Sequence, residues 1–392
     1  MGSQAKVAFV SGGNGISGNA IIEQLIRTSS DDWSKIIVSS KSVLLERWQD
    51  PRIEFIALDF LEPVDSIIKQ MTPSCQAITH AFYTSYVHSE DFAKLPEYNI
   101  PLFKNFLTAV DSVAGKNLLR VCLQTGAKNY GLHLGPMVHC PATEDLPRYN
   151  DKGENFYFAQ EDYLFELAAK RHWHYSVIRP KAIIGYSPSK NGISESITLA
   201  IYFLICRELG EEARFMGNRF FWESTDDQSY APSLADMTLW AMTEENTKNQ
   251  IFNHANGDVV VWRHLYPKLG AYFGARTEDA TSSAALLNEQ AAPTFSMAEW
   301  AKDKREVWDR ICTKYGGNEK AFDWATWDAM DWVGSMTWLT LVSLQKARRF
   351  GWSRYDDTFE TWIQTYKTYE MAGILPPHDE MVPVYKSPIN NA

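Results

Sequence analysis

Three glycines near the start of the chain have the spacing of a phosphate-binding turn. Gly12, Gly15 and Gly18 follow an apolar run that begins at Lys6, and an amphipathic segment continues from them to Ile26. The pattern predicts a strand, a tight turn and a helix, in which Gly12 permits the turn, Gly15 lets the backbone approach a pyrophosphate and Gly18 lets the helix pack closely. The free N–H groups of the helix start would hold phosphates, so we expect a dinucleotide site.

The residues after the second predicted strand indicate which dinucleotide is bound. A site specific for NAD carries Asp or Glu there, to accept a hydrogen bond from the ribose 2′-hydroxyl. This chain has Ser40 and Lys41 instead, and Lys41 could contact a 2′-phosphate. NADP(H) is therefore the expected cofactor, with a solvated surface lysine as the alternative. Asp59 and Phe60 follow the third strand, where they could contact the adenine; a helix N-cap is the alternative for Asp59.

A tyrosine for proton transfer lacks a lysine at the usual spacing. In reductases of the short-chain type, a Tyr beside the nicotinamide is followed four residues later by a Lys on the same helix face. Tyr157 is followed there by Glu161. Tyr186 and Lys190 have the right spacing, but Pro188 between them opposes a helix, so we expect no role for this pair.

The elements that must position these residues alternate as in a parallel α/β sheet. Short apolar runs predict strands, and amphipathic segments between them predict helices. The fold class is therefore a Rossmann-type, doubly wound parallel sheet, in which chemistry belongs at the carboxyl ends of the strands. The predicted strands are Val7–Val10, Lys35–Val38, Ile53–Leu58, Ala77–Tyr83, Leu118–Gln124 and Tyr175–Arg179, and the helices after the first are Pro63–Met71, Pro96–Val113 and Asn155–Arg171.

The second half of the chain is predicted to be mainly helical. We divide the chain into a dinucleotide-binding part, 1–190, and an interleaved substrate-binding and lid part, 191–392. The long irregular segment 125–154 has the character of a functional loop, and Ala280–Pro293 that of a surface loop. Helices are predicted at Ile193–Leu209, Leu234–Met242, Val261–Phe273, Met297–Tyr315 and Trp324–Arg349.

Composition limits the class of protein. With 392 residues, 45% of them hydrophobic, the chain can bury a large core. No stretch reaches the ~18–20 apolar residues of a membrane-spanning helix, the first residues do not have the charged-then-apolar pattern of a secretion signal, and the five cysteines lack metal or redox spacing. The net charge of −10 argues against binding nucleic acid or anionic membranes. We expect a cytoplasmic protein without a metal that acts on a small molecule; its oligomeric state stays open, a homodimer included.

Several motifs follow one another along the chain. Those of the first half are Thr79-His-Ala-Phe-Tyr83, Leu123-Gln-Thr-Gly-Ala-Lys128, Asn155-Phe-Tyr157 with Glu161-Asp162, and Tyr175-Ser-Val-Ile-Arg-Pro180 with Gly185-Tyr-Ser-Pro188. Those of the second half are Phe252-Asn, Asn256-Gly-Asp258, Trp262 and Phe273-Gly274. In this order they resemble the progesterone 5β-reductase and iridoid synthase-like (PRISE) family of atypical short-chain dehydrogenases/reductases, and the resemblance covers nearly the whole chain.

The resemblance implies an NADPH-dependent reduction of an activated C=C bond, by 1,4-addition of hydride to an enone or enal. It implies Lys128 and Tyr157 as the catalytic pair, with the Tyr157 hydroxyl on the substrate carbonyl oxygen and Lys128 supplying positive charge. Besides Gly12 and Gly18 of the turn, the cofactor contacts are those that it implies at Asn14, Gly15, Ile16, Ser40, Lys41, Asp59, Phe60, Ser85, Gln124 and Ile183.

Departures from the family pattern keep other functions open. The family often has two arginines where this chain has Ser40 and Lys41, and a second tyrosine where it has Phe158. We therefore expect a reshaped pocket and carry over no steroid or monoterpenoid substrate. The alternatives are a carbonyl reductase or cyclase that uses the same tyrosine, and a regulator that binds NADP(H) without turnover.

Overall fold

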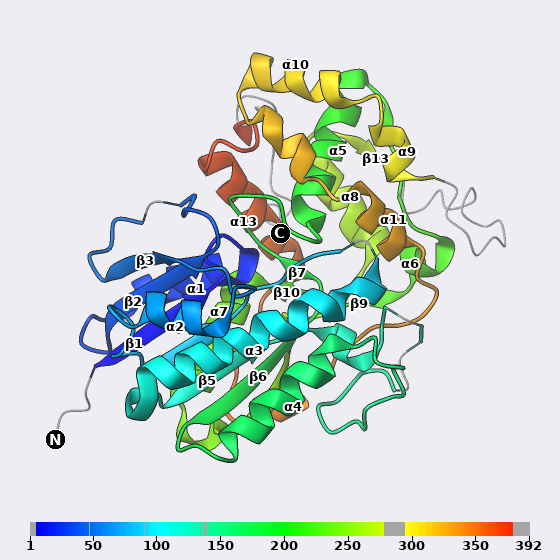
Figure 1. Ribbon diagram of the computed structural model, residues 1–392. Coiled ribbons are helices and arrows are strands. Elements are labelled where there is room, and N and C mark those ends of the chain that lie inside the picture. The colour runs from blue at the N-terminus through cyan, green and yellow to red at the C-terminus, as the bar shows by residue number, and fades with distance from the viewer. Residues whose placement is uncertain are drawn as a thin grey trace.

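A seven-stranded parallel sheet forms the centre of the computed structural model, which describes residues 5–46, 48–89, 91–133, 135–136, 139–277 and 295–378 (Figure 1). The strand order is β11-β6-β5-β4-β1-β2-β3, and all neighbours are parallel. This order is that of the doubly wound dinucleotide-binding fold, extended by one strand, and the predicted fold class is confirmed. The strands are β1 (Lys6–Ser11), β2 (Trp33–Ser40), β3 (Ile53–Ala57), β4 (His80–Tyr83), β5 (Arg120–Gln124), β6 (His174–Pro180) and β11 (Gln250–His254).

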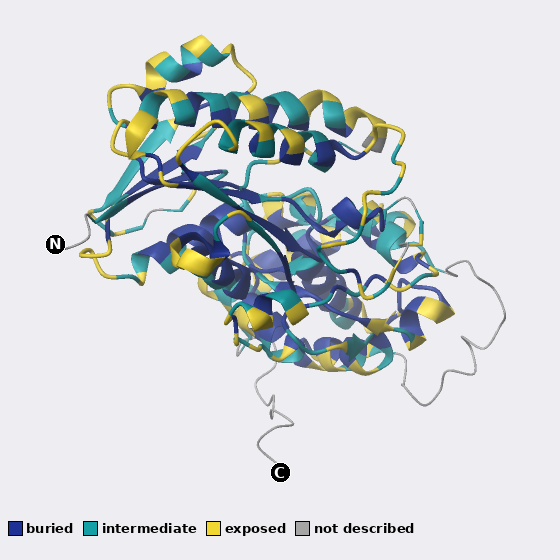
Figure 2. Cartoon of the chain, turned by 90° about the horizontal axis from the view of Figure 1, so that it is seen from below, coloured by how far each residue is buried: buried dark blue, intermediate teal, exposed yellow. Residues whose placement is uncertain are grey.

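Helices cover both faces of the sheet. On one face lie α1 (Ile16–Ile26) and α7 (Ala231–Thr243), which contact each other; on the other lie α2 (Val64–Met71), α3 (Leu95–Ala114) and α4 (Phe156–Ala168). Figure 2 shows the strands buried between these layers, with exposed residues on the outer sides of the helices. Burial on both faces explains why the strands of the sequence are nearly continuous apolar runs.

The edge strand β11 comes from the second half of the chain. It pairs with β6 along its whole length, from Gln250 opposite Ser176 to His254 opposite Pro180. The sequence pattern does not predict this strand, because only two of its five residues are apolar and Asn253 and His254 are polar yet fully buried. Contacts with the rest of the molecule, and not strand propensity, determine this element.

All but one of the remaining helices enclose a second core beside the sheet (Figure 1). This core is rich in buried aromatic side chains, among them Trp222, Trp262, Trp308 and Trp362. Its helices are α5 (Glu195–Leu209), α6 (Arg219–Glu223), α8 (Trp262–Tyr272), α9 (Met297–Ala301), α10 (Arg305–Tyr315), α11 (Trp327–Gly334) and α13 (Thr358–Met371). The other helix, α12 (Gln345–Arg349), packs on the sheet at β11. The pairs of two-residue strands are β7 (Ile183–Ile184) with β10 (Ser229–Tyr230), β9 (Thr225–Asp226) with β12 (Val260–Val261), and β8 (Glu212–Ala213) with β13 (Arg276–Thr277).

The prediction of one long helix over Trp324–Arg349 is wrong. The chain forms α11, an irregular stretch and then α12. Gly334 ends α11 against Met216, where a Cβ atom would lie 2.6 Å from the Met216 carbonyl oxygen. Further on, Val342 forms a bridge with Ala142 and donates its N–H to Asp227 Oδ2 at 2.9 Å. Backbone bonded to other segments in this way cannot continue a helix. The predicted helix Met297–Tyr315 likewise divides, into α9 and α10.

Three further expectations concern membrane-spanning helices, the cysteines and one surface loop. In the described ranges, no helix is long and apolar enough to cross a membrane. The five cysteines, all within those ranges, carry free thiols, and four of them are buried. The predicted surface loop Ala280–Pro293 lies outside the described residues.

Candidate active site

The glycine-rich turn lies where β1 ends and α1 begins. Gly12 has a φ of +74°, which suits glycine, and its carbonyl oxygen accepts the N–H of Gly15 at 2.8 Å. A Cβ atom at Gly18 would lie only 2.2 Å from that carbonyl oxygen. Glycine at position 18 therefore lets the first turn of α1 sit directly on the loop, with the helix start facing the carboxyl end of the sheet.

Asn14 connects this turn to the loop after β2. Its Nδ2 donates to Ser40 Oγ at 3.1 Å and to the Val43 carbonyl oxygen at 2.9 Å, and its Oδ1 accepts the N–H of Leu45 at 3.0 Å. The side chain is thus engaged within the protein, and it shapes the loop that carries Ser40 and Lys41.

Lys41 and Asp59, from the ends of β2 and β3, form an ion pair of 2.8 Å. The Lys41 side chain is 77% exposed, so its amine remains open to a ligand. Asp59 Oδ1 accepts the N–H of Leu61, and α2 begins later, so Asp59 is not the N-cap of that helix. Burial alone would raise the pKa of Asp59, but the ion pair and this hydrogen bond outweigh it, and the pKa is lowered. Phe60 is buried against Phe106, with ring centroids 5.3 Å apart, and leaves little surface for a base.

Unpartnered polar atoms at the end of β5 fit a bound dinucleotide. Gln124 donates Nε2 to Ser17 at 2.6 Å, but its Oε1 and the Thr125 hydroxyl are buried without a hydrogen-bond partner among the described residues. Such atoms are costly unless a ligand or water pairs them. Together with the glycine turn, they form a cradle that a nicotinamide dinucleotide fits. The other predicted contacts lie near the same edge: Ile16 starts α1, Ser85 follows β4, and Ile183 lies in β7.

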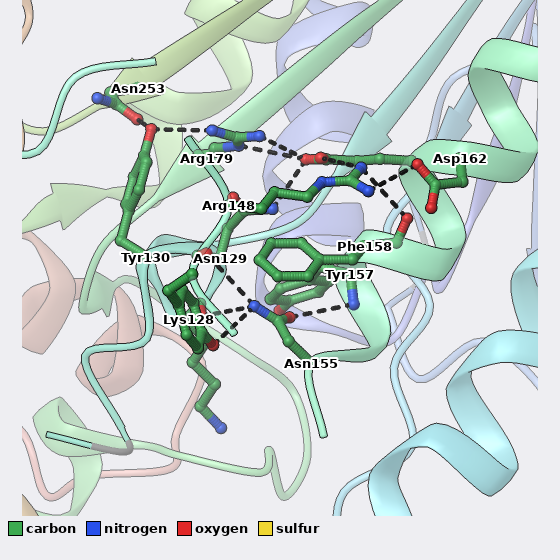
Figure 3. Close-up of polar contacts among 12 residues, drawn as sticks. Lys128, Asn129, Tyr130, Arg148, Asn155, Tyr157, Phe158, Asp162, Arg179 and Asn253 are labelled. Atoms are coloured by element: carbon green, nitrogen blue, oxygen red, sulfur yellow. Dashed lines mark hydrogen bonds and ion pairs between the residues drawn. The ribbon is translucent and has the colours of Figure 1, made fainter. Parts of the chain in front are cut away.

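The segment that carries Lys128 lies against the start of the helix that carries Tyr157. Lys128 belongs to a 3₁₀ turn, η3 (Ala127–Tyr130), directly after β5, and Tyr157 lies in the first turn of α4. Figure 3 shows the Lys128 side chain pointing away from Arg148 and Arg179. Burial lowers the pKa of Lys128 to about 8, so the amine is mostly charged at neutral pH and loses its charge under mildly basic conditions.

The Tyr157 hydroxyl faces the backbone at the end of β5. A Cβ atom at Gly126 would lie 3.4 Å from this hydroxyl and 3.4 Å from the carbonyl oxygen of Pro180. No residue within the described ranges forms a hydrogen bond with the hydroxyl. Burial, and secondarily the nearby Tyr86, raise the pKa of Tyr157. The group is therefore a neutral hydrogen-bond donor across the physiological range.

Glu161, at the position where a lysine is usual, anchors a buried polar network. Its Oε1 accepts from Arg179 Nη2 at 2.8 Å and from Asn129 Nδ2 at 2.9 Å, and Arg148 lies 3.3 Å from its Oε2. Arg179 Nη1 donates to the Tyr130 hydroxyl at 3.1 Å (Figure 3). The sequence shows Glu161 but gives no signal for this network, since Arg179 comes from a strand eighteen residues further on.

A cavity of about 190 Å³ lies beside this network. Neither Lys128 nor Tyr157 lines it, so it is separate from the candidate catalytic pair. Its walls come mostly from the irregular segment before α4 and from the network: Asn129, Tyr130, Glu144, Pro147, Arg148, Tyr149, Glu161 and Arg179 are among the lining residues.

The Tyr186 and Lys190 pair of the sequence takes no part in this site. Tyr186 donates its hydroxyl to Glu46 and packs on Tyr369, so it does not pair with Lys190. Over the ranges that the structure describes, no three His, Cys, Asp or Glu side chains are grouped to hold a metal.

Comparisons with known proteins match nearly the whole chain. Residues 8–349 match the family model described as a PRISE-like Rossmann-fold domain. The short chain dehydrogenase gsfE of Penicillium aethiopicum is 43% identical over 376 residues, which are 95% of this chain and 99% of the relative. The (S)-8-oxocitronellyl enol synthase ISY1 of Nepeta cataria is 31% identical, over 93% of this chain and 92% of the relative. A 3-oxo-Delta(4,5)-steroid 5-beta-reductase of Arabidopsis thaliana is 30% identical, with the same coverage of 93% and 92%.

Proposed function

Because this chain belongs to the family of PRISE-like Rossmann-fold proteins, we propose that it is an NADPH-dependent reductase of an activated C=C bond in a small enone or enal. The relative named as a steroid 5-beta-reductase supports this reaction class. The observation that carries the proposal is the neutral Tyr157 hydroxyl, which forms no hydrogen bond with a described residue and lies on the helix whose start contacts the segment of Lys128.

NADPH is the proposed cofactor, and when bound it supplies the hydride that adds to the β-carbon of the substrate. The glycine turn and the start of α1 would hold its pyrophosphate. Lys41, exposed at the end of β2, would contact the 2′-phosphate, and Gln124 and Thr125 offer buried polar atoms near the nicotinamide end.

The Tyr157 hydroxyl would donate a hydrogen bond to the substrate carbonyl oxygen. When hydride reaches the β-carbon, the C=C electron pair moves toward the carbonyl and negative charge gathers on this oxygen, giving an enolate. A neutral phenol of raised pKa suits this role, because it must stabilise the oxygen and need not give up its proton completely. A proton from solvent then completes the saturated carbonyl product at the α-carbon.

Lys128 would supply positive charge near the same oxygen. Its amine is half-buried, where a charge acts through less water than at the surface. The pKa of about 8 leaves it mostly protonated at neutral pH. Tyr157 and Lys128 then act together as an oxyanion site, the one by hydrogen bonding and the other by charge.

Reduction of a carbonyl group, or reductive cyclisation, is the second candidate. The relative named as an enol synthase favours reductive cyclisation, because an enolate held by the same tyrosine can leave as an enol or close a ring. Carbonyl reduction differs chemically, since the oxygen becomes an alkoxide and must take the phenol proton.

The test is an assay of NADPH oxidation with a panel of small enones and enals, with identification of each product. We expect saturated carbonyl compounds. Tyr157→Phe should lower kcat by roughly 10²–10³-fold, as the loss of one oxyanion donor does, and should leave measurable saturated product. If the wild-type enzyme gave allylic alcohol, the proposal would be wrong and the reaction would be carbonyl reduction. Tight NADPH binding without turnover of any substrate in the panel would favour the alternative of a regulator that binds NADP(H) and catalyses no reaction.

A further inference from the structure

We propose that Asn155 is a positioning residue that fixes the backbone of Lys128 relative to Tyr157. The proposal rests on the proposed function for the roles of Lys128 and Tyr157. Asn155 directly precedes α4 and contacts the segments of both residues, and the residue is only 4% exposed.

The two ends of the Asn155 amide serve two different elements. Oδ1 accepts the backbone N–H of Tyr157 at 3.2 Å and so caps α4. Nδ2 donates to the Lys128 carbonyl oxygen at 3.1 Å, to the Asn129 carbonyl oxygen at 3.3 Å and to the Tyr149 hydroxyl at 3.0 Å (Figure 3). These partners also determine the orientation of the amide, because only the NH₂ end can donate to carbonyl groups.

This bridge needs an amide. A serine or aspartate can cap a helix as well as asparagine can, but neither supplies an NH₂ group for two carbonyl oxygens. Because Asn155 is buried, water cannot easily replace the lost donor, and the carbonyl groups of η3 would be left without it.

A second contact restricts η3 from the same helix. Glu161 Oε1 accepts from Asn129 Nδ2 at 2.9 Å, one turn along α4 from Tyr157. With η3 attached to α4 at two points, a shift of either contact changes where the Lys128 amine lies. Asn155 holds the backbone of Lys128 itself, and is the more direct of the two contacts.

The test separates the bridge from the cap with Asn155→Ser, which retains a capping oxygen and adds no charge. We expect kcat to fall by about 10²-fold, the scale of a misplacement of about 1 Å, while NADPH affinity stays near wild type and the protein remains folded at the assay temperature. Asn318→Ser is the matched control. Asn318 also caps a helix by accepting the N–H two residues on, at 3.0 Å. It directly precedes η6 (Glu319–Trp324), which packs on α10, far from α4 (Figure 1).

A double-mutant cycle with Lys128→Ala tests whether Asn155 acts through Lys128. If it does, Asn155→Ser should lower kcat little further once the amine is gone, because residues that act as a unit are not additive. A loss of the same size in both backgrounds would overturn the proposal.

A readout without turnover keeps the proposal separate from the proposed function. In protein with ¹³C-labelled lysine, NMR titration should place the pKa of Lys128 near 8, with the signal assigned by Lys128→Ala. Asn155→Ser should move this pKa toward 10.5, since a displaced amine regains water. An unchanged titration would overturn the positioning role. If the wild-type enzyme reduces no enone, the proposed function fails, and the titration still decides the role of Asn155.

Discussion

The amine of Lys128 gives the site a pH dependence of known sign. Burial lowers its pKa to about 8, so the charge is present below that pH and is lost above it. We therefore expect kcat/KM for NADPH, which reports groups of the free enzyme, to fall about tenfold per unit as pH rises beyond about 8. Lys128→Ala should lower the neutral-pH rate and remove this basic limb. A rate that rises with pH in the wild-type enzyme would contradict the role of a charged amine.

A substitution at Lys41 tests which dinucleotide the protein prefers. Its amine is exposed and pairs with Asp59 at 2.8 Å, so a 2′-phosphate can approach it without a rearrangement of the core. Lys41→Ala should reduce the preference for NADPH over NADH by about tenfold or more, as the loss of a charge-assisted contact does. Titration of both cofactors into the variant measures the preference.

Lys35→Ala is the matched control for Lys41. Lys35 lies on β2, the strand that Lys41 directly follows, and it too pairs with a carboxylate, Glu54 at 2.5 Å, but near the opposite end of the strand. It should leave the preference unchanged. Equal effects of the two substitutions would make Lys41 an ordinary surface lysine.

Residue types and spacing predict the glycine turn well, because two of its glycines have a steric reason to be there. Gly12 has a positive φ, and Gly18 has no room for a side chain. Lys128 is different. It lies in a 3₁₀ turn on another element from Tyr157, so no helical spacing relates the two, and only the family resemblance indicates the pair. Asn155 and Glu161 act through contacts between elements, which no local pattern contains.

At the scale of elements, the ion pair of Glu161 and Arg179 joins α4 to β6. Both side chains are almost completely buried, and their charged groups are 2.8 Å apart. Glu161→Gln would leave the Arg179 charge without its counter-ion inside the protein, and should lower the free energy of unfolding by about 3–5 kcal/mol. Denaturation in urea measures this. Glu166→Gln, at an exposed position of the same helix, should change it by less than about 0.5 kcal/mol.

The elements themselves were predictable where their own residues determine them. Strands buried on both faces are apolar throughout, and the helices between them have a clear apolar side. The prediction failed where the surroundings decide the structure. β11 is a strand because β6 offers it an open edge, and the stretch after Gly334 is irregular because its backbone bonds to Ala142 and Asp227.

For the whole molecule, Glu195 links pH to stability. It starts α5 and is 6% exposed, and its Oε2 accepts from Gln228 at 3.4 Å. Burial, with the nearby Asp226 charge, raises its pKa to about 7, although Lys181 acts in the opposite direction. In the unfolded chain the pKa is near 4.5. The folded state therefore binds this proton more tightly than the unfolded chain does. The stability gained from this binding is fully present below about pH 4.5 and is lost as pH rises to about 7.

Glu195→Gln should remove this part of the pH dependence. Relative to the variant, the wild-type enzyme should lose roughly 3 kcal/mol of unfolding free energy between pH 4.5 and pH 7.5. Urea denaturation of both proteins at several pH values gives the difference. The same pH dependence in both would show that Glu195 is ionised in the folded protein.

The late position of β11 in the chain has a consequence for synthesis on the ribosome. β6 is complete at Pro180, but the strand that covers its edge ends only at His254. Until those residues leave the exit tunnel, the nascent sheet presents a row of unpaired N–H and C=O groups, the kind of edge at which chains join wrongly. The first half of the protein is thus made before β11 can cover the edge of its sheet. A chaperone that shields this edge during translation would protect the chain in the interval when mispairing is easiest.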